Sequence, residues 1–372
     1  MSWVLAFWLL AGVLLIAPFL PALIEWIART DAAPLVVVRE QDTNIRHFAL
    51  GFFDRVQELL EREGIDPYDP PADYEGEYRP GERFRVLPDS SPPQWPEATQ
   101  RSRVIDVMLV AVGDVLLEGG YVYAQEVYAG GKLVGGSNAT YRAVYAGTDL
   151  LLGDGCTVAR WLHSQGHVYI GADCMIYGRV SSGMSMTLGS GTRFERLNAP
   201  LIRFASDALA EVRATVAPHP REPWQVPQNL HELDEHTLRA AGDLEVPAAC
   251  EVRHHLVARG SLSLGASCRV EGNLKAHDRL VIGAGGVVRG ALVCTGPVHV
   301  GEGSLVKGPV ISETEVIIEP GCVVGTPALP TSITAPLIRL APGSQVSGTI
   351  WASRQGLVDT AQPPGKQTLA NT

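Results

Sequence analysis

The histidines are the first candidates for catalytic residues, because a histidine base within hydrogen-bond reach of an acceptor catalyses group transfer. Ten histidines are present. His163 and His299 lie between two inward-facing positions of the repeat described below, so both are expected to point outward into solvent. His254, His255 and His277 fall in different columns of that repeat and do not stack. The sequence therefore predicts no catalytic residue.

The six cysteines follow the same repeat. Cys156 and Cys174 are eighteen residues apart, as are Cys250 and Cys268, and Cys322 shares the column of the second pair. Free cysteine behaves as a small hydrophobic residue in protein cores, so stacked buried thiols are expected. No CxxC motif and no Cys/His spacing of a zinc site occurs, so the sequence predicts no metal ligand.

Two other kinds of ligand site are also not expected. Asp154 and Asp173 do not recur in one column, as a calcium-binding repeat would require. The glycines of 283–286 precede no predicted helix and no suitably placed lysine, so they do not indicate a phosphate loop. The sequence therefore predicts no bound cofactor.

The element that positions all these residues is an eighteen-residue repeat from Leu262 to Leu329. Apolar residues often alternate with polar ones within a unit, which is the spacing of a β-strand. Such a period is typical of a solenoid, in which the stacked units bury one another's apolar faces. Three columns carry the repeat: Leu262, Leu280, Val298 and Val316; Leu264, Ile282, Val300 and Ile318; and Val270, Val288, Val306 and Val324.

The period also divides into three steps of six residues, because small or aliphatic residues recur at that interval from Leu264 to Val324. Glycines follow the columns and relieve the bends between the steps. The sequence therefore predicts an all-β fold, a parallel β-helix with triangular rungs that lie roughly 4.8 Å apart.

Composition restricts the function further. The formal net charge is −10, and no basic stripe is visible along the sequence. A nucleic-acid surface would need such a stripe to neutralise phosphates. No nucleic-acid partner is expected.

The N-terminal segment, residues 1–28, is predicted to contain a transmembrane helix. Residues 3–23 carry no charge, and about 20 apolar residues in a helix cross a bilayer. A cleavable signal peptide is the alternative, but only Met1 and Ser2 precede the apolar run. Arginines follow the span and none precedes it, which indicates that the bulk of the chain lies on the cytoplasmic side.

Residues 29–103 are predicted to hold an amphipathic helix and a proline-rich linker. Asp42 or Thr43 can cap the helix and Gly64 ends it. The helix is expected to pack on the solenoid or on another copy, and the alternative is a position on the membrane surface. The linker covers 64–96. The apolar positions at helical spacing are Ile45, Phe48, Ala49, Phe52, Val56, Leu59 and Leu60.

The repeat falls into two blocks. The first block is predicted over 104–204, an insertion over 205–243, the second block over 244–353 and a disordered tail over 354–372. An irregular loop at Thr326–Pro336 adds about four residues to the second block, as insertions in repeats do. The last rung runs through Ile338 and Ile350, and it is expected to be a free end that a second copy can cover.

The units Leu280–Cys294 and Val298–Ser312 resemble those of the bactofilins, the bacterial polymer-forming cytoskeletal proteins. The resemblance covers 244–352 well and 127–204 less closely. It implies a β-helical protein without an active site that polymerises by end-to-end stacking. It also implies a scaffold at the bacterial inner membrane, with itself and cell-envelope or cell-shape proteins as partners. The two blocks, the insertion and the long N-terminal region depart from the compact bactofilin pattern.

The hexapeptide-repeat acyltransferases are the alternative family. These enzymes are trimers with sites between subunits. Their left-handed β-helices also carry an aliphatic residue every six positions, and periodicity does not determine the hand of the helix. Such an enzyme needs a histidine base in a cleft, which the histidine columns do not provide. The favoured interpretation is a scaffold and not an enzyme. The dipeptides that fit the hexapeptide template are Leu264-Gly, Ile282-Gly, Val300-Gly and Val324-Gly.

Overall fold

The computed structural model describes residues 45–66, 71, 74–87, 93–205 and 221–360, together with Trp3, Phe7, Trp8 and Leu10. The chain divides into two units, 1–44 and 45–372. The predicted transmembrane segment therefore lies outside the described residues, apart from those four. None of the described helices combines the length and the apolar character that a bilayer crossing needs. The rest of the structural description concerns the second unit.

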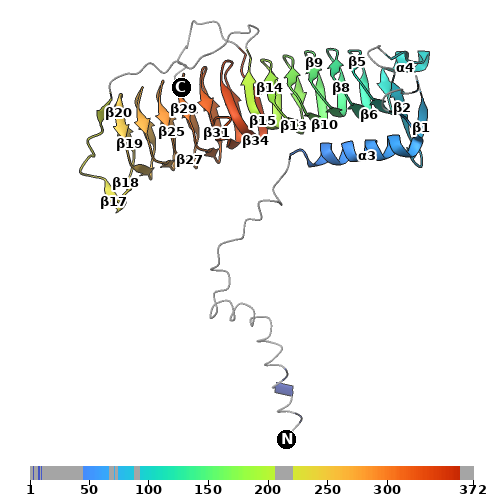
Figure 1. Cartoon of the computed structure of the whole chain (residues 1–372). Coiled ribbons are helices and arrows are strands. Elements are labelled where there is room, and N and C mark those ends of the chain that lie inside the picture. Colours follow the sequence, from blue (N-terminus) through green and yellow to red (C-terminus); the bar gives the residue numbers. More distant parts are fainter. Residues whose placement is uncertain are drawn as a thin grey trace. The chain divides into compact units, whose positions relative to one another are not determined.

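This unit is a β-solenoid of about 13 turns, and strand makes up about 51% of the protein. Each strand pairs in parallel with the strand one rung away, as β22 (Leu262–Leu264) does with β25 (Leu280–Ile282). The partners are eighteen residues apart, which confirms the predicted repeat. The aliphatic columns point inward and form one continuous core from Leu87 to Val358. Figure 1 shows the successive rungs.

The first block spans β3 to β15. Its rungs pair in parallel with an offset of seventeen or eighteen residues, as Tyr145 does with Tyr128 and His163. The strands are β3 (Val104–Ile105), β4 (Met108–Ala111), β5 (Val115–Leu117), β6 (Val122–Ala129), β7 (Leu133–Gly135), β8 (Thr140–Ala146), β9 (Leu150–Leu152), β10 (Thr157–Ser164), β11 (Val168–Ile170), β12 (Met175–Ile176), β13 (Arg179–Ser182), β14 (Ser185–Leu188) and β15 (Arg193–Phe204).

The second block spans β18 to β34. It begins inside the predicted insertion, because β18 already pairs in parallel with β21. A turn closed by Thr326 and Leu329 interrupts it where the irregular loop was expected. Beside β22 and β25, the strands are β18 (Thr237–Ala240), β19 (Leu244–Val246), β20 (Cys250–Val252), β21 (His255–Ala258), β23 (Arg269–Val270), β24 (Leu274–Ala276), β26 (Val287–Val288), β27 (Leu292–Cys294), β28 (Val298–Val300), β29 (Leu305–Val306), β30 (Val310–Ser312), β31 (Glu315–Ile318), β32 (Val323–Val324), β33 (Thr331–Leu340) and β34 (Gln345–Val358).

The two blocks meet at their C-terminal ends. Strand β15, the last of the first block, pairs antiparallel with β34, the last of the second. Leu197 lies opposite Ile350, and both side chains are buried. The expectation that the rung of Ile350 is a free end is therefore wrong, because the first block covers it. The two blocks form one continuous stack (Figure 1).

The outer ends of the stack carry the remaining elements. At the first block, β1 (Glu75–Arg79) and β2 (Glu82–Leu87) form a hairpin, β2 pairs in parallel with β4, and α4 (Glu97–Ser102) follows. Part of the stretch interpreted as a linker thus extends the sheet. At the other end, β16 (Glu222–Pro223) pairs with β20, and β17 (His231–Asp234) pairs with β18.

Helix α3 (His47–Glu63) lies along the first block (Figure 1). It ends where the sequence predicts, because Gly64 adopts the left-handed conformation at φ 65° and bonds back to the last turn. Arg46 precedes its first turn without a side-chain cap. The proposed caps, Asp42 and Thr43, lie outside the described residues.

Candidate functional site

Helix α3 packs on the outer face of the first block, which is the first of the two positions expected for it. Its apolar side chains and outward-facing residues of β2, β4, β6, β8 and β10 form a second hydrophobic cluster beside the core. Phe52 contacts Trp161 with ring centroids 5.4 Å apart, and Phe53 contacts Tyr145 at the same separation. Tyr145 in turn stacks on Tyr128 at 5.3 Å. The solenoid face is apolar here because the helix shields it from water.

Polar contacts at the N-terminal end and in the interior of α3 hold the helix on the solenoid. Gln57 Nε2 donates to the Tyr128 hydroxyl at 3.0 Å, and Arg46 Nη2 donates to the Ser182 carbonyl at 3.0 Å. The guanidinium of Arg179 lies 4.8 Å from the ring centroid of Phe48. These contacts place the charged side of α3 next to one corner of the β-helix.

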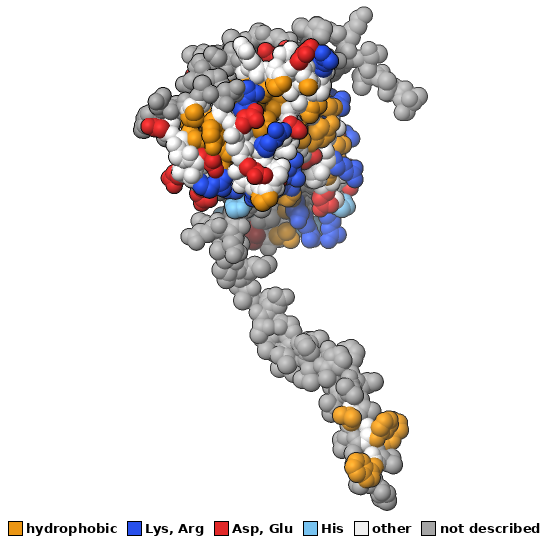
Figure 2. Space-filling view, turned by 90° about the vertical axis from the view of Figure 1, so that its right-hand side faces the viewer, with side chains coloured by type: hydrophobic (Ala, Val, Ile, Leu, Met, Phe, Trp, Pro, Cys, Tyr) orange, Lys and Arg blue, Asp and Glu red, His pale blue; other side chains and the backbone are white. Residues whose placement is uncertain are grey.

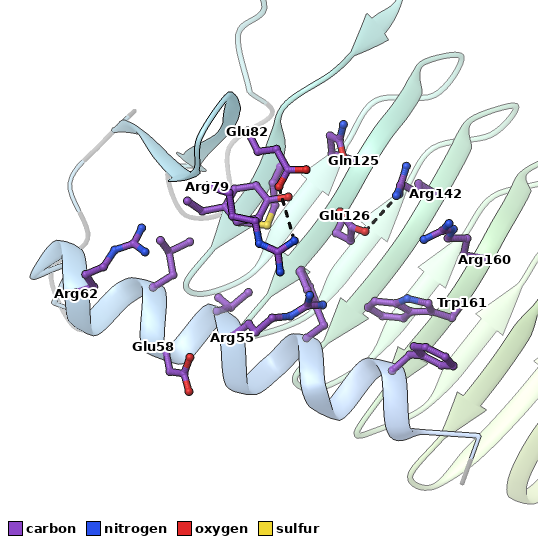
Figure 3. Close-up of a pocket in the computed structure, with 16 residues that line it drawn as sticks. Arg55, Glu58, Arg62, Arg79, Glu82, Gln125, Glu126, Arg142, Arg160 and Trp161 are labelled. Atoms are coloured by element: carbon purple, nitrogen blue, oxygen red, sulfur yellow. Dashed lines mark hydrogen bonds and ion pairs between the residues drawn. The ribbon is translucent and has the colours of Figure 1, made fainter. Parts of the chain in front are cut away.

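A groove of about 580 Å³ lies between α3 and that corner (Figure 3). Arg55, Glu58 and Arg62 line one wall, at positions spaced three and four residues apart on one side of the helix. The opposite wall comes from the hairpin and the solenoid, and apolar residues of α3 and of the solenoid together form the floor. The remaining lining residues are Phe48, Phe52, Val56, Leu59, Tyr78, Arg79, Glu82, Met108, Gln125, Glu126, Arg142, Arg160 and Trp161.

Irregular strand pairing aims the solenoid side chains into the groove. The pairing of β8 with β6 and with β10 shifts register on either side of Arg142. In each neighbouring strand, two residues stand opposite the single residue Arg142. Gln125 is one of the two in β6, and Arg160 is one of the two in β10. A β-bulge of this kind redirects side chains. Arg142 and Arg160 are eighteen residues apart, so the repeat itself could have revealed this pair in the sequence.

The charges of the groove are only partly compensated. Arg142 Nε lies 3.3 Å from Glu126 Oε1, and Arg79 Nη1 lies 4.0 Å from Glu82 Oε2. Arg55 and Arg160 are exposed, and among the described residues neither forms an ion pair. With five arginines against three glutamates, the groove is net positive.

The environment of His163 differs from the solvent-exposed one predicted from the sequence. Its side chain faces away from the core, as expected, but it is only 1% exposed because α3 covers this face. Nδ1 lies 2.7 Å from the Ser181 hydroxyl, and no described group bonds to Nε2. Burial first, and the charge of Arg46 second, lower the pKa of His163 to about 4. A buried neutral imidazole pressed between a helix and a sheet has a packing role.

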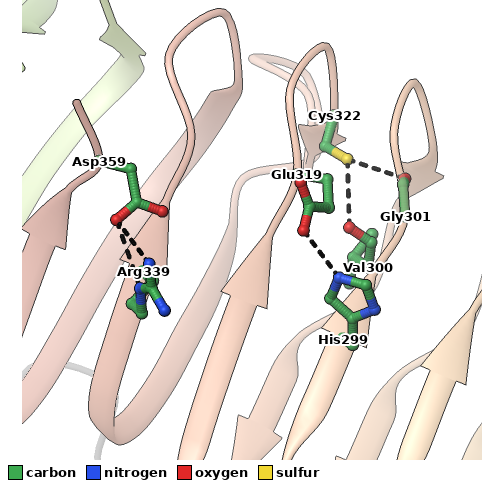
Figure 4. A network of polar contacts seen from close by, with 7 residues as sticks. All are labelled: His299, Val300, Gly301, Glu319, Cys322, Arg339 and Asp359. Atoms are coloured by element: carbon green, nitrogen blue, oxygen red, sulfur yellow. Dashed lines mark hydrogen bonds and ion pairs between the residues drawn. The ribbon is translucent and has the colours of Figure 1, made fainter. Parts of the chain in front are cut away.

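Three other histidines have different surroundings. His299 Nε2 lies 2.9 Å from Glu319 Oε1 on the surface of the second block (Figure 4). His255 Nδ1 accepts a bond from the Asn273 backbone one rung away. His254 borders a small pocket near Trp224. No cluster of three metal-ligand side chains occurs in the described part of the chain.

The cysteines occupy the interior of the rungs, as predicted. All six are free thiols, and Cys250 alone is not fully buried. Cys322 Sγ donates to the Gly301 carbonyl at 3.1 Å, and Cys268 Sγ donates to the Pro247 carbonyl at 3.0 Å. Burial raises the pKa of Cys322 to about 12. Burial also raises the pKa of Cys268, so these two thiols are protonated donors to corner carbonyls and poor nucleophiles.

Aspartates at the corners bond to the next rung. Asp154 Oδ1 accepts from the backbone N–H of Ala172, eighteen residues later, and Asp114 and Asp243 repeat this contact with Lys132 and Ser261. The carboxylates thus cap backbone N–H groups. Figure 2 shows the end that carries α4 and β1, where acidic and basic side chains are interspersed.

The fold places this chain among the β-solenoid proteins. No protein-family model, curated protein or solved structure matches it. Its function is therefore inferred from its own residues.

Proposed function

We propose that this protein is a membrane-anchored, bactofilin-like scaffold. Its β-helix associates with further copies by stacking, and it localises cell-envelope or cell-shape proteins at the bacterial inner membrane. The anchor is the uncharged segment 3–23, with the bulk of the chain on the cytoplasmic side. The role is mechanical and needs no catalytic residue.

The junction of β15 and β34 carries this proposal. Two solenoid ends already meet there through backbone pairing and buried apolar side chains, which is the kind of contact that joins separate β-helices. Asn198 Nδ2 also donates to Thr349 Oγ1 across it at 2.8 Å. The contact supports stacking as a property of these rungs.

The junction also restricts where further copies can attach. Both C-terminal ends are occupied by it, so stacking has to use the outer ends. Among the described strands, β17 pairs only with β18, and all four of its residues are exposed. An exposed strand edge is a template for pairing with another chain.

Electron microscopy and sedimentation of the purified full-length chain test the proposal. Rods longer than one molecule, or filaments, are expected. Leu233→Lys adds a charge to the outermost strand and should reduce assembly, because lysine protects strand edges. Ile311→Lys, at an equally outward position in the middle of the second block, should not. Monomers throughout would overturn the proposal, and discrete trimers would favour the acyltransferase alternative.

A further inference from the structure

We propose that the groove between α3 and the first block binds an extended acidic peptide segment of a partner protein. This inference rests on the proposed scaffold function, since it says how such a scaffold holds a client. It follows from the shape of the groove, the distribution of its charges and the apolar floor between them.

The shape of the groove fits an extended chain. It follows α3 from Phe48 to Arg62, a length of roughly 21 Å at helical rise. A strand-like segment of about six residues spans its length.

Arginines on both walls suit carboxylates. Arg55 stands on the helix side and Arg160 on the solenoid side, and neither has a carboxylate partner among the described residues. Arg142 stands one rung from Arg160, about 4.8 Å along the axis. Guanidinium groups bind carboxylates through two parallel hydrogen bonds. A bound segment with acidic side chains would neutralise the excess positive charge.

The floor supplies an apolar contact between the arginines. Phe52 and Val56 from α3 meet Met108 and Trp161 from the solenoid there. Trp161 is 9% exposed, so its indole ring retains a small accessible area. Aromatic and aliphatic side chains of a peptide can bury against this floor, and such central apolar contacts contribute most of the affinity of many interfaces.

The glutamates in the walls favour a peptide over a uniform polyanion. Glu58, Glu82 and Glu126 would repel the closely spaced charges of a nucleic acid or an anionic membrane. A peptide presents backbone N–H donors and apolar side chains between its carboxylates, so it can satisfy both signs of charge. The mixed lining thus matches an acidic segment with interspersed apolar residues.

Fluorescence anisotropy with the full-length chain tests this inference. The probe is a labelled ten-residue peptide of alternating glutamate and leucine. The control peptide, called the glutamine twin, has glutamine in place of each glutamate. The acidic probe should bind, and the pair Arg55→Glu and Arg160→Glu should weaken it about tenfold or more. Both side chains are exposed, so the fold should persist in a circular dichroism spectrum. Arg253→Glu, with a side chain 80% exposed on the second block, is the matched control.

Equal affinity of all variants, or equal binding of the glutamine twin, would overturn the inference. Groove-dependent binding to phosphatidylglycerol vesicles without peptide binding would also overturn it, in favour of a lipid ligand. Sedimentation of the same variants separates the two proposals. Assembly without peptide binding contradicts only the groove, and peptide binding without assembly contradicts only the stacking scaffold.

Discussion

Leu197 of the first block and Ile350 of the second are opposite partners in an antiparallel pair of strands, and both are fully buried. They are 153 positions apart in the sequence. Their contact converts two solenoids with open ends into one stack. Each half of the protein thus covers the apolar cross-section of the other.

Ile350→Asp should therefore disrupt the junction itself. An unpaired carboxylate would enter the core, and we expect a loss of roughly 3 kcal/mol or more in the free energy of unfolding. Ser353→Asp is the matched control, because Ser353 lies on the same strand, is exposed and has no register partner in β15. Urea denaturation followed by circular dichroism measures both. Equal stability of the two variants would mean that the junction does not exist in solution.

Gly356 is the second probe of the junction. A methyl group on this residue would overlap the ring of Phe194, which is buried beside it. Gly356→Ala should cost about 1–3 kcal/mol, because a packed core resists added volume. Gly242→Ala has open space and should be neutral or stabilising. Thermal unfolding of each variant gives its melting temperature. An unchanged melting temperature for Gly356→Ala would contradict the close contact between Gly356 and Phe194.

Two stacked tyrosines in the core give a paired prediction. The ring centroids of Tyr123 and Tyr141 lie 4.9 Å apart, and the two ring planes are nearly parallel. The Tyr123 hydroxyl donates to the Glu118 carbonyl at 3.0 Å, while no described group bonds to the Tyr141 hydroxyl. Tyr123→Phe should lose about 1 kcal/mol, and Tyr141→Phe should be neutral or stabilising, because an unpaired buried hydroxyl costs free energy. Denaturant titration that ranks the two variants in the opposite order would contradict this assignment.

His163 should make the docking of α3 sensitive to acid. Its pKa is about 4 in the folded protein and about 6.5 in an unfolded chain, so the unfolded state binds the proton more readily. Stability from the neutral imidazole is fully present above pH 6.5. It should fall as the pH decreases from about 6.5 to about 4, by roughly 3 kcal/mol.

Unfolding free energies at pH 7 and pH 5 measure this effect. His163→Gln should show a smaller loss between the two pH values than the parent chain, whatever its stability at pH 7. His231→Gln, on an exposed strand, serves as the control and should keep the parent's loss. An identical loss in the His163 variant would show that this histidine is not buried in the neutral form.

Gly135 shows how a departure from the repeat carries structural information. It occupies the column of Leu117 and Leu152, where an aliphatic residue is expected. A side chain at Gly135 would overlap the Tyr141 hydroxyl. The glycine thus makes room for the tyrosine of the same rung.

The sequence alone determined the solenoid. Its strands pair one repeat away, so the eighteen-residue pattern of apolar residues specifies both the rung and its register, and it also places the cysteines inside. The exact end of α3 at Gly64 is likewise a local property of glycine in the left-handed conformation. The local sequence pattern is sufficient to predict the strand pairing of a residue wherever its partner lies one period away.

The tertiary structure alone decided how these parts meet. The antiparallel junction joins strands about 150 residues apart, and no periodic pattern encodes such a pair. The burial of His163 and the groove of Arg55 and Arg160 depend on which face α3 covers, and an amphipathic pattern shows that a helix has an apolar face without showing what lies against it. Contacts between elements distant in sequence depend on the shape of both surfaces, which exist only once each part has folded.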